Sequence, residues 1–112
     1  MRLRLSRGSK HKNKHVRLDG YTFDSQAEAR RYQDLKLLLK AGKVEKLKVH
    51  PVYEITVMDI HIGDYEADFV YFDVELGREI TEDVKGQRTD LYRWKKNLMK
   101  AIYGIDIKEV EA

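Results

Sequence analysis

Two acidic residues and a lysine lie in or beside hydrophobic stretches, where charged side chains are unfavourable. Asp68 lies in the most hydrophobic extended stretch of the chain. A carboxylate there is costly unless it pairs with a cation, such as an arginine at a sheet edge, or binds a metal ion. Asp83 and Lys85 lie near the end of the next extended stretch. Because strand side chains alternate, these two should project to one face and Glu82 to the other.

Glu28 is a third acidic candidate. On a helix, positions 28, 32, 35 and 39 share one face, and the last three are Tyr32, Leu35 and Leu39. Glu28 is therefore expected to face the sheet. It also matches a capping box with Ser25, a structural role that is compatible with a place over the end of the sheet.

Together these residue types suit the chemistry of a hard metal ion. Two or three carboxylates are typical ligands of Mg²⁺ or Mn²⁺. A neighbouring lysine can orient a metal-bound water or stabilise charge on a phosphate, as phosphodiester hydrolysis requires. The chain has no cysteine, which excludes a disulfide scaffold, a cysteine zinc site and a thiol nucleophile. His50 and His61 are expected to be structural or surface residues rather than ligands.

The net charge of +3 combines a basic arm with an acidic body. The cations of the first 18 residues, which contain no acid, are Arg2, Arg4, Arg7, Lys10, Lys12, Lys14 and Arg17. The remainder holds 15 cations against all 19 acids. Such an arm suits contacts with a phosphate backbone, although a solvated tail has the same composition. The first aromatic residue is Tyr21, so the arm is expected to contact backbone rather than stack on bases.

The hydrophobic pattern predicts two helices and several strands around one core. Residues 1–15 are expected to form a basic flexible arm and residues 16–112 a single domain. The expected helices are 26–41 and a second one from Thr89 or Asp90 to 103. The expected extended segments are short pieces around Asp19-Gly20, a stretch over 44–57 bent at Pro51, and strands over 64–73, 79–85 and 105–110. Residues 58–63 are expected to form a turn region. The order of helix, three strands, helix and strand predicts an α/β or α+β fold with a central mixed sheet flanked by helices.

The pairing of the two central strands decides whether the charged residues meet. If the chain turns at residues 75–78, paired positions should sum to about 153. That register places Asp68 opposite residue 85 and one diagonal step from Asp83. We therefore expect three charges to converge at one end of the sheet.

Four segments in this order resemble a family of small phage and prophage endodeoxyribonucleases of the PD-(D/E)xK type. They are Phe23-x-Ser25-x-x-Glu28-x-x-x-Tyr32, His50-Pro51, Tyr65-x-Ala67-Asp68-Phe69-x-Tyr71 and Glu82-Asp83-Val84-Lys85-Gly86. The pattern is also similar to that of the endonuclease subunit of a transposase. The resemblance implies a restriction-endonuclease-like core with the order αβββαβ.

The resemblance also implies roles for individual residues. Asp68 and Asp83 would be metal ligands, Glu28 a third ligand, direct or through water, and Lys85 the catalytic lysine. Three accessory residues are weaker candidates: Gln87, Glu82 and Lys95. Gln87 lies just past the strand, and Glu82 would be structural or would support the ligand Asp83. Lys95, like Lys96 on the same helix, would face either the DNA backbone or only solvent. The expected cofactor is Mg²⁺, for which Mn²⁺ should substitute.

By the same resemblance, the expected function is Mg²⁺-dependent hydrolysis of DNA, and in particular resolution of Holliday junctions in phage recombination or replication. Symmetric cutting of two strands needs two active sites, so a homodimer is expected. We expect a phage or prophage protein that acts in the bacterial host cytoplasm, without membrane association or a nucleotide cofactor. The alternatives are a non-catalytic nucleic-acid-binding protein and a nuclease subunit of a transposase or recombinase complex.

Overall fold

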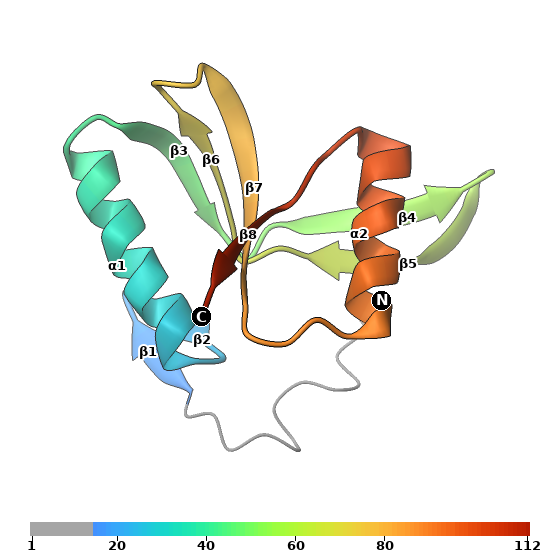
Figure 1. Cartoon of the computed structure of the whole chain (residues 1–112), viewed down its shortest axis with the longest axis horizontal. Helices are drawn as coiled ribbons and strands as arrows, with labels where there is room; N and C mark the ends of the chain where they lie inside the picture. The colour runs from blue at the N-terminus through green and yellow to red at the C-terminus, as the bar shows by residue number, and fades with distance from the viewer. Residues whose placement is uncertain (1–14) are drawn as a thin grey trace.

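The structure, a computed structural model, describes residues 15–112 and has two helices and eight strands in that range (Figure 1). In chain order they are β1 (Val16–Leu18), β2 (Tyr21–Phe23), α1 (Gln26–Lys40), β3 (Val44–Val49), β4 (Val52–Val57), β5 (Ile60–Glu66), β6 (Phe69–Asp73), β7 (Arg78–Lys85), α2 (Asp90–Tyr103) and β8 (Lys108–Glu111). Neither helix is long and apolar enough to cross a membrane.

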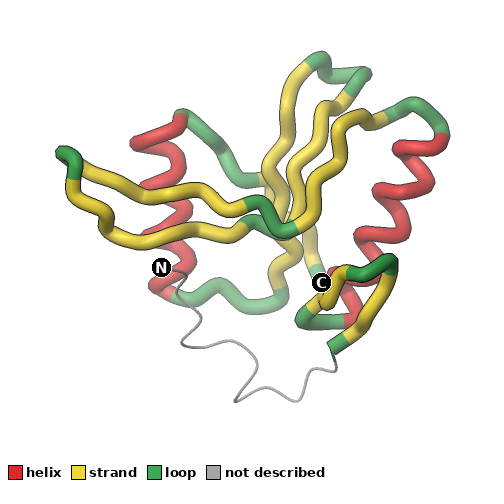
Figure 2. Tube along the Cα trace, turned by 180° about the vertical axis from the view of Figure 1, so that it is seen from behind, coloured by secondary structure: helices red, strands yellow, loops and turns green. Residues whose placement is uncertain are grey.

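The centre of the fold is a mixed four-stranded sheet with the order β3-β6-β7-β8. β6 pairs antiparallel with both β3 and β7, and β8 pairs parallel with β7. The strands β1 and β2 form one separate hairpin, and β4 and β5 form another. Helices α1 and α2 lie on opposite sides of the four-stranded sheet (Figures 1 and 2). The expected mixed α+β class with a mixed sheet between helices is confirmed.

The ends of both helices follow from local sequence signals. The Ser25 side chain caps α1 by accepting the backbone N–H of Glu28 at 3.2 Å. Thr89 caps α2 in the same way, and Gly104 ends that helix in the left-handed conformation. One expected core position on α1 is wrong. Leu39 is 41% exposed, because the buried stripe of the helix continues through the partly buried Leu38 instead.

Each face of the sheet has its own hydrophobic core. On the α1 side the larger buried side chains are those of Phe23, Tyr32, Leu35, Phe69, Tyr71 and Ile80. On the α2 side they are those of Ile55, Tyr65, Tyr92, Met99 and Ile107. Phe69 and Tyr71 of β6 and Ile80 of β7 belong to the core on the α1 side, whereas Ala67, just before β6, belongs to the core on the α2 side.

Two expected stretches are each divided into two strands. The stretch 44–57 breaks at His50-Pro51, and the stretch 64–73 breaks at Ala67-Asp68. The two breaks lie side by side, since His50 N–H donates to the Asp68 carbonyl at 2.9 Å and Ala67 N–H donates to the Pro51 carbonyl at 3.0 Å. At this crossing both chain segments leave the four-stranded sheet and form the β4–β5 hairpin. Asp68 therefore lies at a crossing between strands and not inside one continuous strand.

The region expected to be a turn, 58–63, is mostly strand. Only Met58 and Asp59 form the turn, both with positive φ, and β5 begins at Ile60. The last strand also begins later than expected, at Lys108, because Ile105 still donates its N–H to the last turn of α2 at Met99. The resulting β4–β5 hairpin projects from the body of the molecule (Figure 2).

Candidate active site

Asp68 lies directly across from Asp83, not across from residue 85 as the expected register had it. Phe69 pairs with Glu82, so paired positions of β6 and β7 sum to 151. The turn has the expected four residues but lies one residue earlier, at 74–77, because Asp73 closes it. The Asp73 carbonyl accepts Gly77 N–H at 2.8 Å, and its side chain accepts Leu76 N–H at 2.9 Å. Because the shift is two residues, every side chain stays on its expected face.

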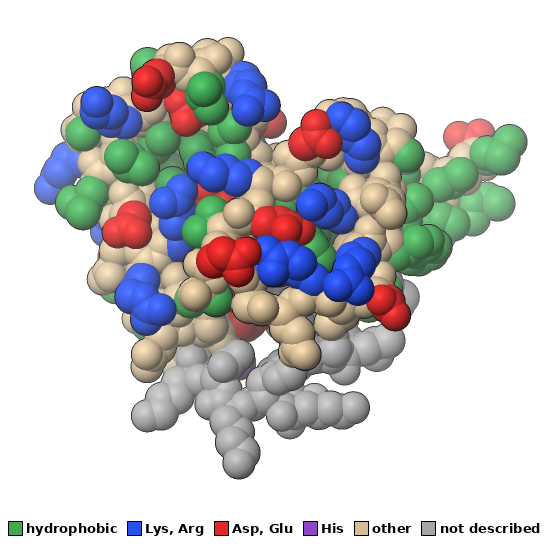
Figure 3. Space-filling model, viewed as in Figure 1, with side chains coloured by type: hydrophobic (Ala, Val, Ile, Leu, Met, Phe, Trp, Pro, Cys, Tyr) green, Lys and Arg blue, Asp and Glu red, His purple; other side chains and the backbone are tan. Residues whose placement is uncertain are grey.

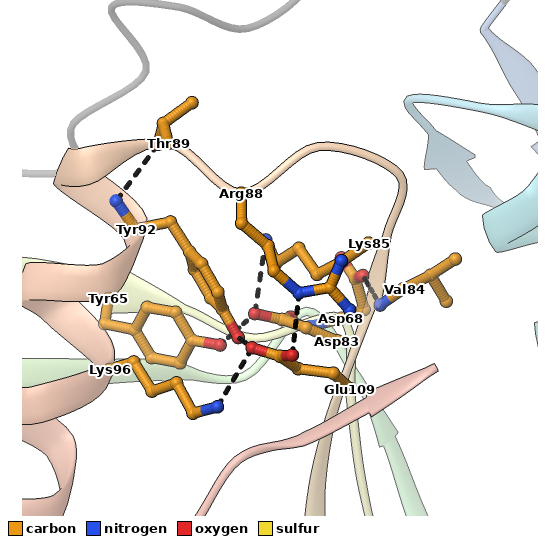
Figure 4. Close-up of polar contacts among 10 residues, drawn as sticks. All are labelled: Tyr65, Asp68, Asp83, Val84, Lys85, Arg88, Thr89, Tyr92, Lys96 and Glu109. Carbon is orange, nitrogen blue, oxygen red and sulfur yellow. Dashed lines mark hydrogen bonds and ion pairs between the residues drawn. The ribbon is translucent and has the colours of Figure 1, made fainter. Parts of the chain in front are cut away.

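Each aspartate side chain accepts a backbone N–H from the segment that carries the other aspartate. One oxygen of Asp83, Oδ1, accepts the backbone N–H of Asp68 at 2.8 Å, and Oδ2 of Asp68 accepts the backbone N–H of Val84 at 2.8 Å. Asp83 is 1% exposed, and Asp68 is also buried. These bonds fix both carboxylates at the point where the β5–β6 crossing meets the end of β7 (Figure 4).

Lys85 shares the α2 face of β7 with Asp83. Its Nζ lies 3.5 Å from Oδ2 of Asp83 and 3.9 Å from the centre of the Tyr92 ring. The ring provides a cation–π contact that holds the ammonium beside the carboxylate. The expected convergence of Asp68, Asp83 and Lys85 at one sheet end is what the structure shows.

Tyr65 provides a support that the sequence interpretation missed. Its hydroxyl donates to Oδ2 of Asp83 (Figure 4). Burial and the nearby Asp83 charge raise the pKa of Tyr65, so the phenol keeps its proton and remains a donor. The alternation of residues in β5 places Tyr65 on a buried face, but only the pairing of β5, β6 and β7 brings it to Asp83.

Glu28 and His50 approach Asp68 from the α1 side. One ligand atom from each of Glu28, His50 and Asp68 lies within 4.8 Å of the other two. Glu28 is buried, as its helix face predicted, and His50 is half-buried. His50 was expected to have a structural or surface role, and its place here could be recognised only once the two strand breaks were known to be neighbours. His61 is exposed and lies beside Glu54.

The acidic cluster is electrostatically unfavourable in the absence of a cation. Burial, and then the charges of Asp83 and Glu28, raise the pKa of Asp68 well above its usual range. Burial also raises the pKa of Asp83, although Lys85 opposes that shift. Buried carboxylates that resist ionisation suit a divalent cation, because the cation supplies the missing countercharge.

Glu82 belongs to a different environment from Asp83. It is fully buried on the α1 face, where Arg31 of α1 binds both of its oxygens at 2.7 and 2.8 Å. Tyr71 donates a third hydrogen bond to Glu82 at 2.6 Å. All of these contacts support a structural role in which Glu82 joins α1 to the sheet.

Removing Arg31 should therefore destabilise the fold strongly. Arg31→Ala leaves the Glu82 charge buried with only Tyr71 as a partner, and we expect the free energy of unfolding to fall by about 3–5 kcal/mol. Chemical denaturation measures this loss. Arg30→Ala, at an exposed position of the same helix, is the matched control and should cost less than about 0.5 kcal/mol. Equal losses in the two variants would contradict the structural role.

The other accessory candidates have different positions. Lys95 is buried, and its Nζ donates to the Asp64 carbonyl at 2.7 Å, so it does not lie on the exposed surface of α2 as expected. Gln87 is exposed in the loop after β7, and Arg17 is exposed on β1. The remaining arm residues Arg2, Arg4, Arg7, Lys10, Lys12 and Lys14 lie outside the described residues.

A charged network anchors the loop that follows Lys85. Arg88 binds Glu109 at 2.8 Å and Glu111 at 2.6 Å. Tyr92 and Lys96 also donate to Glu109, at 2.8 and 3.0 Å (Figure 4). These donors, Arg88 first, lower the pKa of Glu109 to about 2. The network ties the loop to α2 and β8, and its partners are too distant in sequence to be predicted from local patterns.

The fold and the site define a mixed α+β protein with a buried carboxylate cluster beside a lysine. The chain belongs to a family of proteins of unknown function, DUF1064, whose model matches residues 8–110. No curated protein and no solved structure matches the chain.

Proposed function

We propose that this protein is a metal-dependent endodeoxyribonuclease that hydrolyses DNA phosphodiesters. The observation that carries the proposal is the meeting of Asp68, Asp83 and Lys85 at one end of the sheet, with Glu28 supplied by α1. An acid cluster without a cation would repel a phosphate, whereas the same cluster with a divalent ion attracts it. Lys85, beside the cluster, provides a cation that can stabilise the negative charge that develops on the phosphate during hydrolysis.

The topology supports the same proposal. Without the β1–β2 and β4–β5 hairpins, the element order is α1, β3, β6, β7, α2 and β8. That order is the αβββαβ order that the resemblance implies, and the acidic residues come from α1, from the crossing before β6 and from β7. The β4–β5 hairpin is then an insertion into the meander.

The residues fit a divalent metal. Asp68, Asp83 and Glu28 would hold Mg²⁺, which would supply Lewis-acid activation of a water and charge neutralisation at the phosphate. Tyr65 orients Asp83 through its hydroxyl. Lys85 places an ammonium beside Oδ2 of Asp83, where it can hold a water or a phosphate oxygen.

Branched DNA is the proposed substrate, and the basic residues of the N-terminal arm are the proposed backbone contacts. The test incubates the purified protein with labelled four-way junctions, flaps and plain duplex, with Mg²⁺ or with a chelator. We expect Mg²⁺-dependent nicks that are most frequent on the four-way junction. Binding of these substrates without cleavage would favour the non-catalytic alternative, and cleavage only after addition of a transposase or recombinase would favour the partner-dependent one.

The β4–β5 hairpin is the proposed contact between two copies of the chain. At its outer end Met58 is 90% and Ile60 64% exposed, with Val57 and Ile62 also exposed. Figure 3 shows hydrophobic side chains gathered over this projecting end. Residues 52–66 contain four acids and no lysine or arginine, so the surface repels nucleic acid. An exposed apolar surface with acidic residues around it favours a protein partner over DNA. We propose a second copy of the chain as that partner, because a nuclease that cuts two strands symmetrically needs two active sites.

A charged hairpin end should separate the two copies. We expect the wild-type chain to be a dimer and the double variant Met58→Glu/Ile60→Glu to dissociate at least about tenfold more readily, because two buried apolar contacts become charged. Light scattering after size-exclusion chromatography measures the mass. Leu76→Glu, at an exposed apolar position on the β6–β7 turn, is the control and should remain dimeric. A monomeric wild-type chain at high concentration would rule out this contact.

A further inference from the structure

His50 is held opposite Asp68 by the backbone of the crossing. It follows β3 and has a φ of 56°, a left-handed conformation that costs a non-glycine residue free energy. Its N–H donates to the Asp68 carbonyl at 2.9 Å, and the next residue, Pro51, accepts the N–H of Ala67 at 3.0 Å. The two strand breaks thus fix each other, and they present the side chains of His50 and Asp68 at one place.

The imidazole ring has a fixed support on its other side. Its centre lies 5.5 Å from the centre of the fully buried Phe23 ring, at an interplanar angle of 56°. A ring nitrogen and one carboxylate oxygen each of Glu28 and Asp68 lie within 4.8 Å of one another. Ligand atoms of one octahedral ion are about 3–4.2 Å apart when the bonds are about 2.1 Å long. Small side-chain movements would therefore bring all three groups onto a single ion.

Asp83, the other proposed ligand, approaches Asp68 from the α2 face of the sheet. Its two oxygens accept the N–H of Asp68 and the hydroxyl of Tyr65, and Lys85 lies beside it. Glu28, His50 and Asp68 place their ligand atoms within 4.8 Å of one another, and this set contains a nitrogen donor. Mg²⁺ prefers an all-oxygen shell, whereas imidazole is a better ligand for transition metals.

We propose that His50 is a metal ligand and that the site formed by Glu28, His50 and Asp68 selects Mn²⁺ over Mg²⁺. This inference rests on the proposed nuclease site and names its preferred ion. Mn²⁺ accepts both carboxylate and imidazole ligands in an octahedral shell, so it gains from the nitrogen, whereas Mg²⁺ gains little. Mg²⁺ can then support the reaction, but it binds to this cluster more weakly than Mn²⁺ does.

Two variants test the role of the imidazole nitrogen without disturbing the left-handed backbone conformation at position 50. His50→Asn and His50→Gly both tolerate the left-handed φ, so neither should disturb the crossing. Asn retains an oxygen that can replace the imidazole as a ligand, whereas Gly provides no ligand. Thermal melts of the metal-free variants show whether they fold like the wild-type chain.

The measurement is metal binding to the full chain without DNA. Titration followed by the paramagnetic resonance of free Mn²⁺ gives the Mn²⁺ affinity, and calorimetry gives the Mg²⁺ affinity. We expect Mn²⁺ to bind the wild-type chain on the order of tenfold more tightly than Mg²⁺. His50→Gly should weaken Mn²⁺ binding by about 10–100-fold. His50→Asn should reduce the Mn²⁺ preference to within about threefold, because its ligands are all oxygen.

Electron spin echo modulation of the bound Mn²⁺ reports a coordinated nitrogen directly, and it needs only the wild-type chain. We expect nitrogen modulation from His50. Bound Mn²⁺ without nitrogen modulation, or a folded His50→Asn variant that keeps the full Mn²⁺ preference, would overturn the inference. Because no DNA is present, a chain that fails to cleave can still show nitrogen-bound Mn²⁺, and a chain that cleaves can lack it. The failure of this inference is therefore distinguishable from failure of the proposed function.

Discussion

Lys85→Ala should reduce metal-dependent DNA cleavage by about 10²–10⁴-fold, the range typical for loss of a proton-transferring or charge-stabilising group. The Lys85 ammonium lies 3.5 Å from Oδ2 of Asp83 and is partly exposed, so it can reach a phosphate held by the metal. The loss should appear in the single-turnover rate constant, because the group acts on the reacting phosphate, with a much smaller change in metal affinity.

The packing of Lys85 on Tyr92 requires a second variant. Lys85→Met keeps an apolar stem against the Tyr92 ring while removing the charge, so it should lose as much activity as Lys85→Ala and retain a wild-type melting temperature. Lys100→Ala is the matched control, because Lys100 is an exposed α2 lysine paired with Asp106 at 2.8 Å. A Lys85→Met rate constant within about threefold of wild type would remove Lys85 from the proposed chemistry.

Asp68→Asn should abolish cleavage and at the same time stabilise the metal-free protein. The wild-type carboxylate is buried between the charges of Asp83 and Glu28, and its pKa is raised for that reason. Asn removes the charge and keeps an oxygen for the N–H of Val84, which now bonds to Asp68 at 2.8 Å. We expect a gain of about 0.5–2 kcal/mol in the free energy of unfolding, as is common when a functional site is relieved of strain.

The stabilisation should depend on pH with a defined sign. Since the folded-state pKa of Asp68 lies above its unfolded value, the native protein binds this proton more tightly. The favourable contribution of Asp68 is complete below the unfolded pKa, about 3.9, and is lost as pH rises through the folded pKa. The difference in unfolding free energy between Asp68→Asn and wild type should therefore increase from pH 4 toward neutral pH.

Added metal should reverse the order of stability. Mg²⁺ or Mn²⁺ binds the native wild-type cluster and raises its melting temperature by mass action, whereas Asp68→Asn should respond weakly. Chemical denaturation across pH, with and without metal, measures both effects. A metal-free Asp68→Asn variant less stable than wild type at neutral pH would contradict the electrostatic description of the cluster.

Much of this framework could be predicted from local sequence. Ser25, Thr89 and Gly104 end their helices by local hydrogen bonds or by a left-handed conformation, and these act within a few residues. The alternation of a strand correctly placed Asp83 and Lys85 on one face and Glu82 on the other. That prediction remains correct although the expected pairing of β6 with β7 is wrong by two residues, because a shift by an even number leaves each side chain on the same face.

The rest of the site depends on contacts between distant segments. Nothing local marks the break at Ala67-Asp68, where hydrophobic alternation runs on without a glycine or proline. The break exists because this segment lies beside His50-Pro51, and that neighbourhood also brings His50 to the cluster. Likewise, the Tyr65 bond to Asp83 and the Arg31 pair with Glu82 each join elements that sequence periodicity cannot relate.

The most direct test of the central claim is cleavage of a labelled four-way junction by the purified wild-type chain and by Asp83→Asn, in parallel preparations with Mg²⁺, Mn²⁺ or a chelator. Asn keeps the oxygen that accepts the N–H of Asp68, and its amide nitrogen can donate to the Tyr65 oxygen in place of the present bond, so the variant should fold. We predict cleavage by the wild-type chain only when a divalent ion is present, and a loss of at least about 10²-fold in Asp83→Asn. A folded wild-type chain that cuts no DNA substrate with either ion, or an Asp83→Asn variant that cuts as fast as wild type, would contradict the proposed function.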